Sequence, residues 1–208
     1  PYGCKRPAFH DEYLPTFNMP HVTLVDTAPR GVSKINENGV IHEGTEYPLD
    51  VLIYATGFKW QETATFNMIV GKDGQSLRKK WQSEGTKTFL GIHSNGFPNL
   101  FIVTGPQGGG GSFNFTEAIE THSDYLIWIL ETMRDQGVGV VDIKKEHENE
   151  YAEHCRAVDI STSAFRDCIS YYNGEGKAEP GSLSYYGGGQ WHKYRANAEQ
   201  TLDPYMFK

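Results

Sequence analysis

The chain has 208 residues, of which 38% are hydrophobic and 13% aromatic, so it can bury a core and is not predicted to be disordered. Its formal net charge of −7 argues against nucleic acid as the main partner, because binding to phosphates calls for a basic surface. No apolar run reaches the length of a membrane span and no signal-peptide pattern opens the chain, which favours a cytoplasmic enzyme without a membrane partner.

Neither a disulfide framework nor a metal site is predicted. The three cysteines, Cys4, Cys155 and Cys168, are odd in number and far apart, which favours a reducing compartment. His147 and His154 fall on one predicted helix, but they are about two turns apart and have no third ligand, so they do not form a zinc pattern.

The first part of the chain is predicted to be β structure. Residues 21–26 and 32–35 read as strands, and Asn38-Gly39 is a strong hairpin signal before a return strand at Val40-Ile41. Residues 50–56 include five consecutive apolar or aromatic positions, which is typical of a strand buried on both faces of a parallel sheet. We therefore expect a small β-meander that leads into a buried strand.

The end of that buried strand, at Thr56 and Gly57, is a first candidate site. A glycine lets the backbone approach a ligand closely, and a threonine hydroxyl can form a hydrogen bond with it. Ligands of open α/β sheets bind at the carboxyl ends of strands. The alternative is an ordinary buried strand that ends in a glycine turn.

The middle of the chain alternates irregular and regular sequence. Residues 59–85 are polar and irregular, with one short helix predicted at 76–82, and residues 98–106 read as a second buried strand. Four consecutive glycines follow within residues 107–112, which resembles an engineered linker. Because a strand precedes this loop and a capped helix follows it directly, we interpret the loop as native.

Two amphipathic helices are predicted after the glycine loop. The first has Asn114 as its N-cap, Glu117 three residues later and Gly137 as its stop signal. Its buried face is predicted to be Ile119, His122, Leu126, Ile129, Leu130 and Met133. The second helix is predicted from Asp142, with Ile143, His147, Tyr151, Cys155 and Val158 on its buried face.

The glycine loop before the first of these helices is a second candidate site. Free backbone N–H groups and the helix dipole, equivalent to about half a positive charge, favour an anion such as a phosphate or a reduced flavin. The alternative is that the glycines only permit a tight turn. No dinucleotide-binding glycine fingerprint occurs in the 208 residues, so the chain alone is not expected to hold a dinucleotide.

Lys5-Arg6 is a third candidate site. Arginine stays protonated at any working pH and offers a fixed fork of donors, which suits an oxygen that becomes negative during a reaction. The alternative is an exposed basic pair without a role.

Several segments resemble, in the same order, class B flavoprotein monooxygenases of the Baeyer–Villiger type. The resemblance spans nearly the whole chain and rests on the set rather than on any one motif. The segments are Gly3-Cys4-Lys5-Arg6-Pro7, residues 13–14 and 17–18, residues 22–26, residues 50–58 with Ala55-Thr56-Gly57-Phe58, residues 96–101 and 104–106, Asn114, Ile119-Glu120 with His122, residues 170–172 and residues 188–195.

The resemblance implies an α/β parent protein with two Rossmann-like dinucleotide-binding domains, of which this chain is the carboxyl-terminal portion. Residues 1–58 would be the last part of the NADPH-binding domain, and residues 59–208 the carboxyl-terminal part of the FAD-binding domain with a wrapping tail. The implied partner is the amino-terminal half of the same protein, and this segment alone is expected to be inactive.

The implied reaction uses NADPH, FAD and O2 to insert one oxygen atom next to a ketone carbonyl, which gives an ester or a lactone. Two alternatives remain open from the sequence. One is a related class B flavin monooxygenase that oxygenates nitrogen or sulfur, and the other is a non-catalytic fragment that binds a partner chain.

The resemblance also implies roles for single residues. Arg6 matches the catalytic arginine beside the flavin, and Lys5 matches a lysine near the 2′-phosphate of NADPH. Tyr171 stands where the family usually has a tryptophan that contacts the nicotinamide cofactor. The implied cofactor-binding residues are Lys5, Thr56, Gly57, Gly105, Asn114, Phe115 and Tyr171, and the implied substrate-pocket residues are Gly110, Gly111, Ser112 and Phe113.

Overall fold

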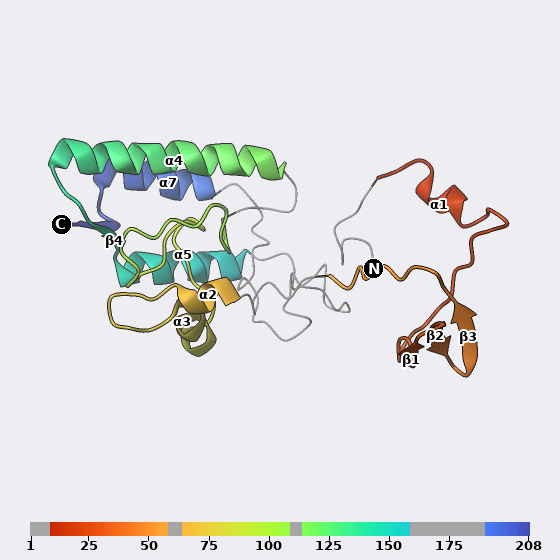
Figure 1. Cartoon of the computed structure of the whole chain (residues 1–208). Helices are drawn as coiled ribbons and strands as arrows, with labels where there is room; N and C mark the ends of the chain where they lie inside the picture. Colours follow the sequence, from red (N-terminus) through yellow and green to blue (C-terminus); the bar gives the residue numbers. More distant parts are fainter. Residues whose placement is uncertain (1–8, 58–63, 109–113, 159–189) are drawn as a thin grey trace. The chain divides into compact units, whose positions relative to one another are not determined.

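The computed structural model describes residues 9–57, 64–108, 114–158 and 190–208 (Figure 1). The chain divides into two compact units, Pro7–Phe58 and Lys59–Lys208 together with Pro1–Arg6. Both helices and short strands occur, and the larger unit is a small α/β domain. Among the described residues, no helix combines the length and the apolar character needed to cross a bilayer.

The smaller unit contains a β-meander, but the prediction is confirmed only for the hairpin of its first two strands. A short helix, α1 (Tyr13–Thr16), precedes an antiparallel sheet with the strand order β1 (Lys34–Asn36), β2 (Gly39–His42) and β3 (Thr45–Pro48). The hairpin prediction is confirmed, because Asn36 faces Gly39 across the turn and its side-chain oxygen accepts the N–H groups of Asn38 and Gly39. A Cβ at Gly39 would collide with the carbonyl oxygen of Tyr47, so this position requires glycine.

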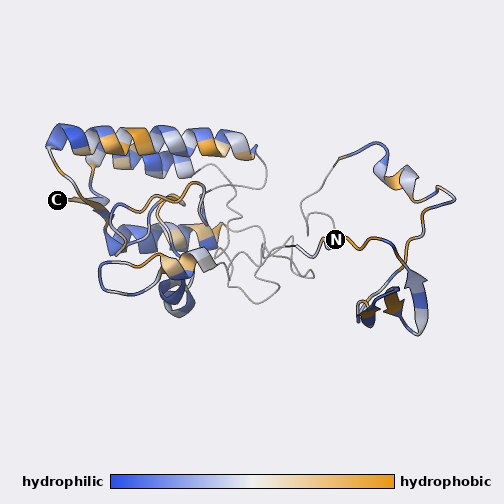
Figure 2. Cartoon of the chain, in the orientation of Figure 1, coloured by the Kyte–Doolittle hydropathy of each residue, from blue (hydrophilic) through white to orange (hydrophobic). Residues whose placement is uncertain are grey.

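Two strands predicted in this unit do not form. Residues 21–26 and 50–56 pair with no strand among the described residues, and Val51, Ile53 and Tyr54 are 72%, 83% and 68% exposed. A strand of this type needs hydrogen-bonded neighbours and cover on both faces. The described residues supply neither, so the prediction of burial is wrong for this chain, and the segment is an exposed apolar ribbon (Figure 2).

The larger unit is mainly helical. Its elements are α2 (Ala64–Met68), α3 (Leu77–Glu84), α4 (Phe115–Gln136), α5 (Lys145–Ala157), α7 (Trp191–Thr201) and a two-stranded antiparallel sheet of β4 (Val141–Ile143) and β5 (Tyr205–Phe207). The helix predicted at 76–82 is confirmed as α3, and the side chain of Ser76 caps it by accepting the N–H of Lys79. Helices α4 and α7 run side by side (Figure 1), and Arg195 of α7 donates to the carbonyl of Thr121 on α4.

Helix α4 begins and ends as predicted. The side chain of Asn114 accepts the N–H of Thr116, and Gly137 ends the helix in the left-handed conformation. Of the predicted face, His122, Ile129 and Met133 are buried and Leu126 is half-buried, whereas Ile119 and Leu130 are exposed. Ala118 and Tyr125 complete the buried stripe instead, so the face of α4 that meets the core is rotated relative to the predicted face.

Two further predictions need correction. Helix α5 begins at Lys145 rather than near Asp142, because Asp142 and Ile143 pair with β5 in the sheet. Tyr151 and Cys155 are buried as predicted, but His147 is half-buried beside Asp203 and Val158 is exposed. Residues 98–106 form no strand, since Ile102 and Gly105 donate to the carbonyls of Ile92 and Gly91 in a turn rather than to a neighbouring strand.

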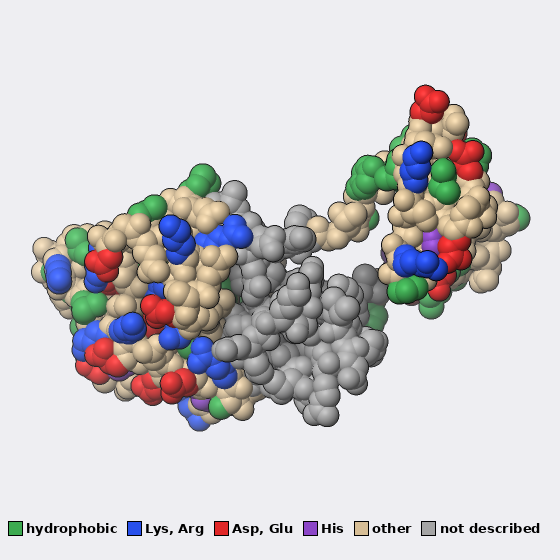
Figure 3. All heavy atoms as spheres, turned by 90° about the horizontal axis from the view of Figure 1, so that it is seen from below, with side chains coloured by type: hydrophobic (Ala, Val, Ile, Leu, Met, Phe, Trp, Pro, Cys, Tyr) green, Lys and Arg blue, Asp and Glu red, His purple; other side chains and the backbone are tan. Residues whose placement is uncertain are grey.

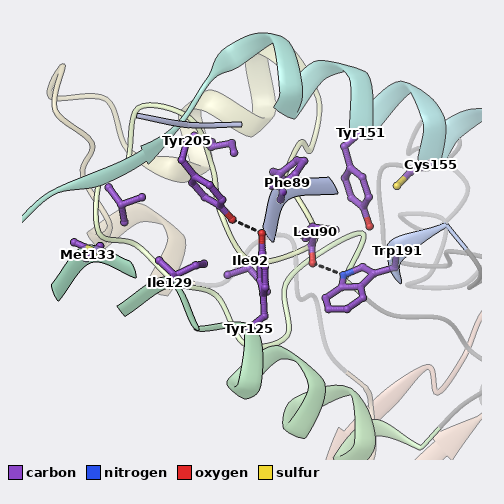
Figure 4. Packing of buried hydrophobic residues seen from close by; sticks show 13 residues of the cluster. Phe89, Leu90, Ile92, Tyr125, Ile129, Met133, Tyr151, Cys155, Trp191 and Tyr205 are labelled. Atoms are coloured by element: carbon purple, nitrogen blue, oxygen red, sulfur yellow. Dashed lines mark hydrogen bonds between the residues drawn. The ribbon is translucent and has the colours of Figure 1, made fainter. Parts of the chain in front are cut away.

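The main core lies between α4, α5, α7 and the segment at residues 89–92. The hydroxyls of Tyr125 and Tyr205 lie 2.6 Å apart, and the indole N–H of Trp191 donates to the carbonyl of Leu90 at 2.9 Å. Figure 4 marks both hydrogen bonds with dashed lines. The buried cluster comprises Phe89, Leu90, Ile92, Tyr125, Ile129, Met133, Val141, Ile143, Tyr151, Cys155, Trp191, Ala198 and Tyr205. In a smaller cluster, Leu77 and Trp81 of α3 pack with Phe97.

A buried ion pair joins α3 to α5. The ammonium of Lys80 lies 2.7 and 2.8 Å from the two carboxylate oxygens of Glu148, and it also donates to Ser94 and to the carbonyl of Asn95. Glu148 in turn accepts the N–H of Asn95. Burial lowers the pKa of Lys80, and the neighbouring Glu148 carboxylate opposes that shift. Because both charges have hydrogen-bond partners, the network fixes α3 and α5 relative to the turn at Ser94 and Asn95.

Candidate functional site

The described part of the glycine loop, Gly105–Gly108, packs directly against the turn at Gly91; we call Gly105–Gly108 the loop base. The N–H of Gly105 donates to the carbonyl of Gly91 at 2.8 Å. Gly91 has a φ of +73°, and a Cβ there would collide with the backbone of Gly108. A Cβ at Gly105 would likewise collide with the carbonyl of Gly91, so this close approach of two backbones requires glycine at both positions.

Gln107 fixes the loop base from inside. Its side chain is 1% exposed, its Oε1 accepts the N–H and the hydroxyl of Thr88, and its Nε2 donates to the carbonyl of Thr86. Its own carbonyl accepts the hydroxyl of Tyr151 on α5 at 2.8 Å. Gln107 was not predicted to be a site residue, although its position between Pro106 and the glycine run could have indicated a role in fixing the loop.

His122 fixes the next residue of the loop base. Its Nε2 lies 2.8 Å from the carbonyl oxygen of Gly108, so Nε2 carries the proton and donates. Burial lowers the pKa of His122 to about 4, with a smaller contribution from the nearby Arg195, while the bond to Gly108 acts in the opposite direction. The ring is therefore neutral near pH 7 and serves as a hydrogen-bond donor. Its Nδ1 is buried, and none of the residues that the structure describes offers that atom a hydrogen-bond partner.

Trp191, the first residue of α7, holds His122 in place. The two rings are stacked with centroids 5.2 Å apart and planes 9° apart. The indole N–H donates to the carbonyl of Leu90, next to Gly91. The guanidinium of Arg195 lies over the rings of Tyr125 and Trp191, 5.5 and 5.8 Å from their centroids. From the sequence, Trp191 was noted only within residues 188–195 of the family resemblance, and helix α7 was not predicted.

The structure places five of the predicted site residues. Gly105 is buried in the loop base, and Asn114 and Phe115 are exposed at the amino end of α4, so these three belong to one loop–helix element. Thr56 and Gly57 are exposed at the end of the smaller unit, and Gly57 has a φ of +84° with open space where a Cβ would stand. Lys5, Arg6, Gly110, Gly111, Ser112, Phe113 and Tyr171 lie outside the described residues.

The chemistry of this element is that of a binding site rather than of proton transfer. The amino end of the 22-residue helix α4 is exposed, and such an end suits the negatively charged edge of a ligand. His122, which touches the loop base at the carbonyl of Gly108, stays neutral. No group of three or more His, Cys, Asp or Glu side chains that could hold a metal ion occurs among the described residues.

No protein-family model matches the chain, but individual proteins do. It is 39% identical over 198 residues to pentalenolactone D synthase of Streptomyces exfoliatus, covering 89% of this chain and 33% of that protein. It is 36% identical over 213 residues to a Baeyer–Villiger monooxygenase of Streptomyces coelicolor, covering 97% of this chain and 35% of that protein. The chain thus spans about a third of the length of these curated relatives.

Solved structures agree with these relatives. The polycyclic ketone monooxygenase of the fungus Thermothelomyces thermophila superposes with a TM-score of 0.84 at 29% identity, over 100% of this chain and 36% of that chain. OTEMO in complex with FAD and NADP superposes with a TM-score of 0.84 at 26% identity, over 100% of this chain and 39% of that chain.

Proposed function

We propose that this chain belongs to the Baeyer–Villiger monooxygenase family and is the carboxyl-terminal part of an NADPH- and FAD-dependent enzyme. That enzyme inserts one oxygen atom from O2 next to a ketone carbonyl and produces an ester or a lactone. The observation that carries the proposal is the continuity of the match, since a Baeyer–Villiger monooxygenase aligns with 97% of the chain. The relatives carry names of ketone oxygenation, which disfavours nitrogen or sulfur as the oxygenated atom.

The proposed parent has two Rossmann-like domains. Residues 1–58 complete the NADPH-binding domain with a meander and a closing strand, and residues 59–208 complete the FAD-binding domain. The division of the chain after Phe58 supports this boundary. The exposed apolar run at residues 51–54 supports it too, because such a run suits a strand that enters a sheet built by the rest of the parent.

The proposed partner of the chain is therefore the remainder of the same protein. The smaller unit exposes many large hydrophobic side chains, some of which are visible in Figure 3. Apolar surface of this extent marks an interaction site in a folded protein. The side chains concerned are Phe9, Tyr13, Leu14, Met19, Leu24, Val32, Ile35, Leu49, Val51, Leu52, Ile53 and Tyr54.

The described residues fit FAD as one side of a shared site. The exposed amino end of α4 offers backbone donors to an anionic ring edge. The loop base that precedes it in the sequence is held by the hydrogen bond from His122 to Gly108. The chain has no glycine fingerprint for a pyrophosphate, so the rest of the parent holds that group. When bound, FAD supplies the electron transfer from NADPH to O2.

The proposal gives individual residues the roles that the family resemblance implies. Gly105, Asn114 and Phe115 face the flavin, and Thr56 and Gly57 accommodate the cofactors where the chain passes between the domains. Arg6 holds the negative charge that develops on oxygen, Lys5 contacts the 2′-phosphate of NADPH, and Tyr171 contacts the nicotinamide side. The substrate pocket is lined by Gly110, Gly111, Ser112 and Phe113.

The proposal is tested by comparing the complete protein with the 208-residue chain. The complete protein is expected to show the visible spectrum of bound flavin and to consume NADPH in a ketone-dependent way. The chain alone is expected to bind FAD negligibly. Tight, stoichiometric FAD binding by the chain alone would contradict the proposed division of the cofactor site.

A further inference from the structure

The loop base is held by a chain of contacts that starts in the carboxyl-terminal helix. Trp191 of α7 stacks on His122 of α4, and His122 donates to the carbonyl of Gly108. Trp191 also donates to the carbonyl of Leu90, beside the Gly91 backbone on which Gly108 rests. One tryptophan thus acts on both backbone segments that meet at the loop base.

These contacts leave the loop base little freedom. A Cβ at Gly108 would lie 2.7 Å from Cε1 of His122 and 3.0 Å from the Cα of Gly91, so the backbone is enclosed between ring and turn. His122 is 1% exposed, so water does not compete for the hydrogen bond to Gly108. The loop continues from Gly108 into the residues assigned above to the substrate pocket.

We propose that His122 and Trp191 are positioning residues for the loop base, so that the carboxyl-terminal helix fixes the backbone from which the proposed substrate-pocket residues continue. The structural part of the inference concerns only the contacts described here. Its kinetic consequence rests on the proposed function. Neither side chain takes part in the chemistry, because both act through the backbone of Leu90, Gly91 and Gly108.

Two substitutions separate the hydrogen bond of His122 from its ring. His122→Phe keeps a flat ring against Trp191 and removes the donor, which leaves a buried carbonyl at Gly108 without its partner. His122→Gln keeps an N–H donor that can reach the carbonyl and removes the ring. His93→Phe is the matched control, because His93 is equally buried but its ring packs on Phe101 and Tyr205.

The first measurement is amide hydrogen exchange in the complete protein, which does not depend on turnover. His122→Phe is expected to raise exchange in the loop base about ten- to a hundredfold, the effect of losing a buried hydrogen bond, and to leave β4 and α5 unchanged. His122→Gln is expected to stay near the parent, and so is the loop base of His93→Phe. Trp191→Phe is expected to loosen the loop base as well, because the bond to Leu90 is lost.

The second measurement is steady-state kinetics. His122→Phe is expected to raise the ketone KM about tenfold and to release more hydrogen peroxide, while reduction of the flavin by NADPH changes less than about twofold. His122→Gln should restore both values. A purely structural role would instead lower every rate and the amount of bound flavin together.

The inference is overturned if His122→Phe and His93→Phe change loop exchange equally, or if His122→Gln behaves like His122→Phe. If His122→Phe does not fold, amide exchange of the loop base in Trp191→Phe and in His122→Gln tests the inference instead. Exchange is expected to rise in the first variant and to stay near the parent in the second. If loop exchange responds as expected but the parent protein oxygenates no ketone, the proposed function fails and the positioning role stands.

Discussion

The imidazole of His122 and the indole of Trp191 lie face to face, with a 9° angle between their planes, and join two helices that are distant in the sequence. The same two side chains donate to the carbonyls of Gly108 and Leu90, where the glycine loop meets the turn at Gly91. The end of the chain is therefore coupled to the element that most resembles a cofactor and substrate site. Its contribution to the site is made through backbone geometry.

Stability is expected to fall with acidification because two buried histidines resist protonation. Burial lowers the pKa of His93 to about 3 and that of His122 to about 4, against 6.5 in the unfolded chain. Their folded pKa values are depressed, so below pH 6.5 the unfolded state binds protons that the folded state does not, and stability decreases as pH falls toward 4. The slope is about 1.4 kcal/mol per pH unit for each histidine.

Urea unfolding of the chain, followed by tryptophan fluorescence between about pH 7.5 and 4.5, measures this slope on both sides of the ordinary histidine pKa of ~6.5. His93→Phe and His122→Phe should each remove about one proton from the pH dependence. A slope that is identical in both variants and in the parent would show that other groups dominate.

The Lys80–Glu148 pair is expected to be sensitive to the loss of one partner. Glu148→Ala leaves the Lys80 ammonium buried without its counter-charge and should cost about 3–5 kcal/mol of unfolding free energy. The double variant Lys80→Met with Glu148→Leu should recover most of this loss, because it removes both desolvated charges. Urea denaturation of the three proteins checks the expectation, and a double variant less stable than Glu148→Ala contradicts it.

Lys5 is expected to set the preference for NADPH over NADH. In the complete protein, Lys5→Ala should raise the KM for NADPH about ten- to a hundredfold, since a charge-assisted contact contributes about 1.5–3 kcal/mol. NADH lacks the 2′-phosphate, so its KM should change much less. Equal effects on both cofactors would remove Lys5 from this role.

Arg6 is expected to be essential for oxygenation but not for cofactor binding. Arg6→Ala in the complete protein should retain FAD and its reduction by NADPH, lose ~10²–10³ in the rate of ester formation and release hydrogen peroxide instead. Arg6→Lys should rescue poorly, because a point charge does not reproduce the guanidinium fork. If Arg6→Ala forms the ester at a rate within a few-fold of the parent, Arg6 is an exposed cation without a catalytic role.

Local signals in the sequence predicted the structure well where the structure is locally determined. Asn114 and Gly137 mark the two ends of α4, Ser76 caps α3, and Asn38-Gly39 forms its hairpin, because each acts on a backbone within a few residues. The prediction of which residues of α4 are buried was less accurate, since an apolar pattern does not show which side of the helix faces the core.

Elements that depend on distant partners could not be predicted. Helix α7 buries few side chains, with Trp191 and Ala198 as its buried residues, so it has little apolar periodicity. Strand β5 has three residues and exists through pairing with β4. The run at residues 50–56 has the composition of a covered strand, but its cover is absent from the described residues.

The candidate site divides in the same way. The glycine loop and the helix that follows it were readable as one element, because capping and glycine conformations are local properties. The contacts of His122, Gln107 and Trp191 with the loop base were not readable, because they join segments brought together only by the packed core.

The most direct test of the central claim is the fate of dioxygen in the complete protein. The protein is incubated with NADPH, a polycyclic ketone and isotopically labelled O2, and the product is analysed by mass spectrometry. The account predicts an ester or lactone that carries one labelled oxygen atom, formed in step with NADPH consumption. Unchanged ketone alongside flavin-bound protein that reduces O2 only to hydrogen peroxide, for every ketone tested, would contradict it.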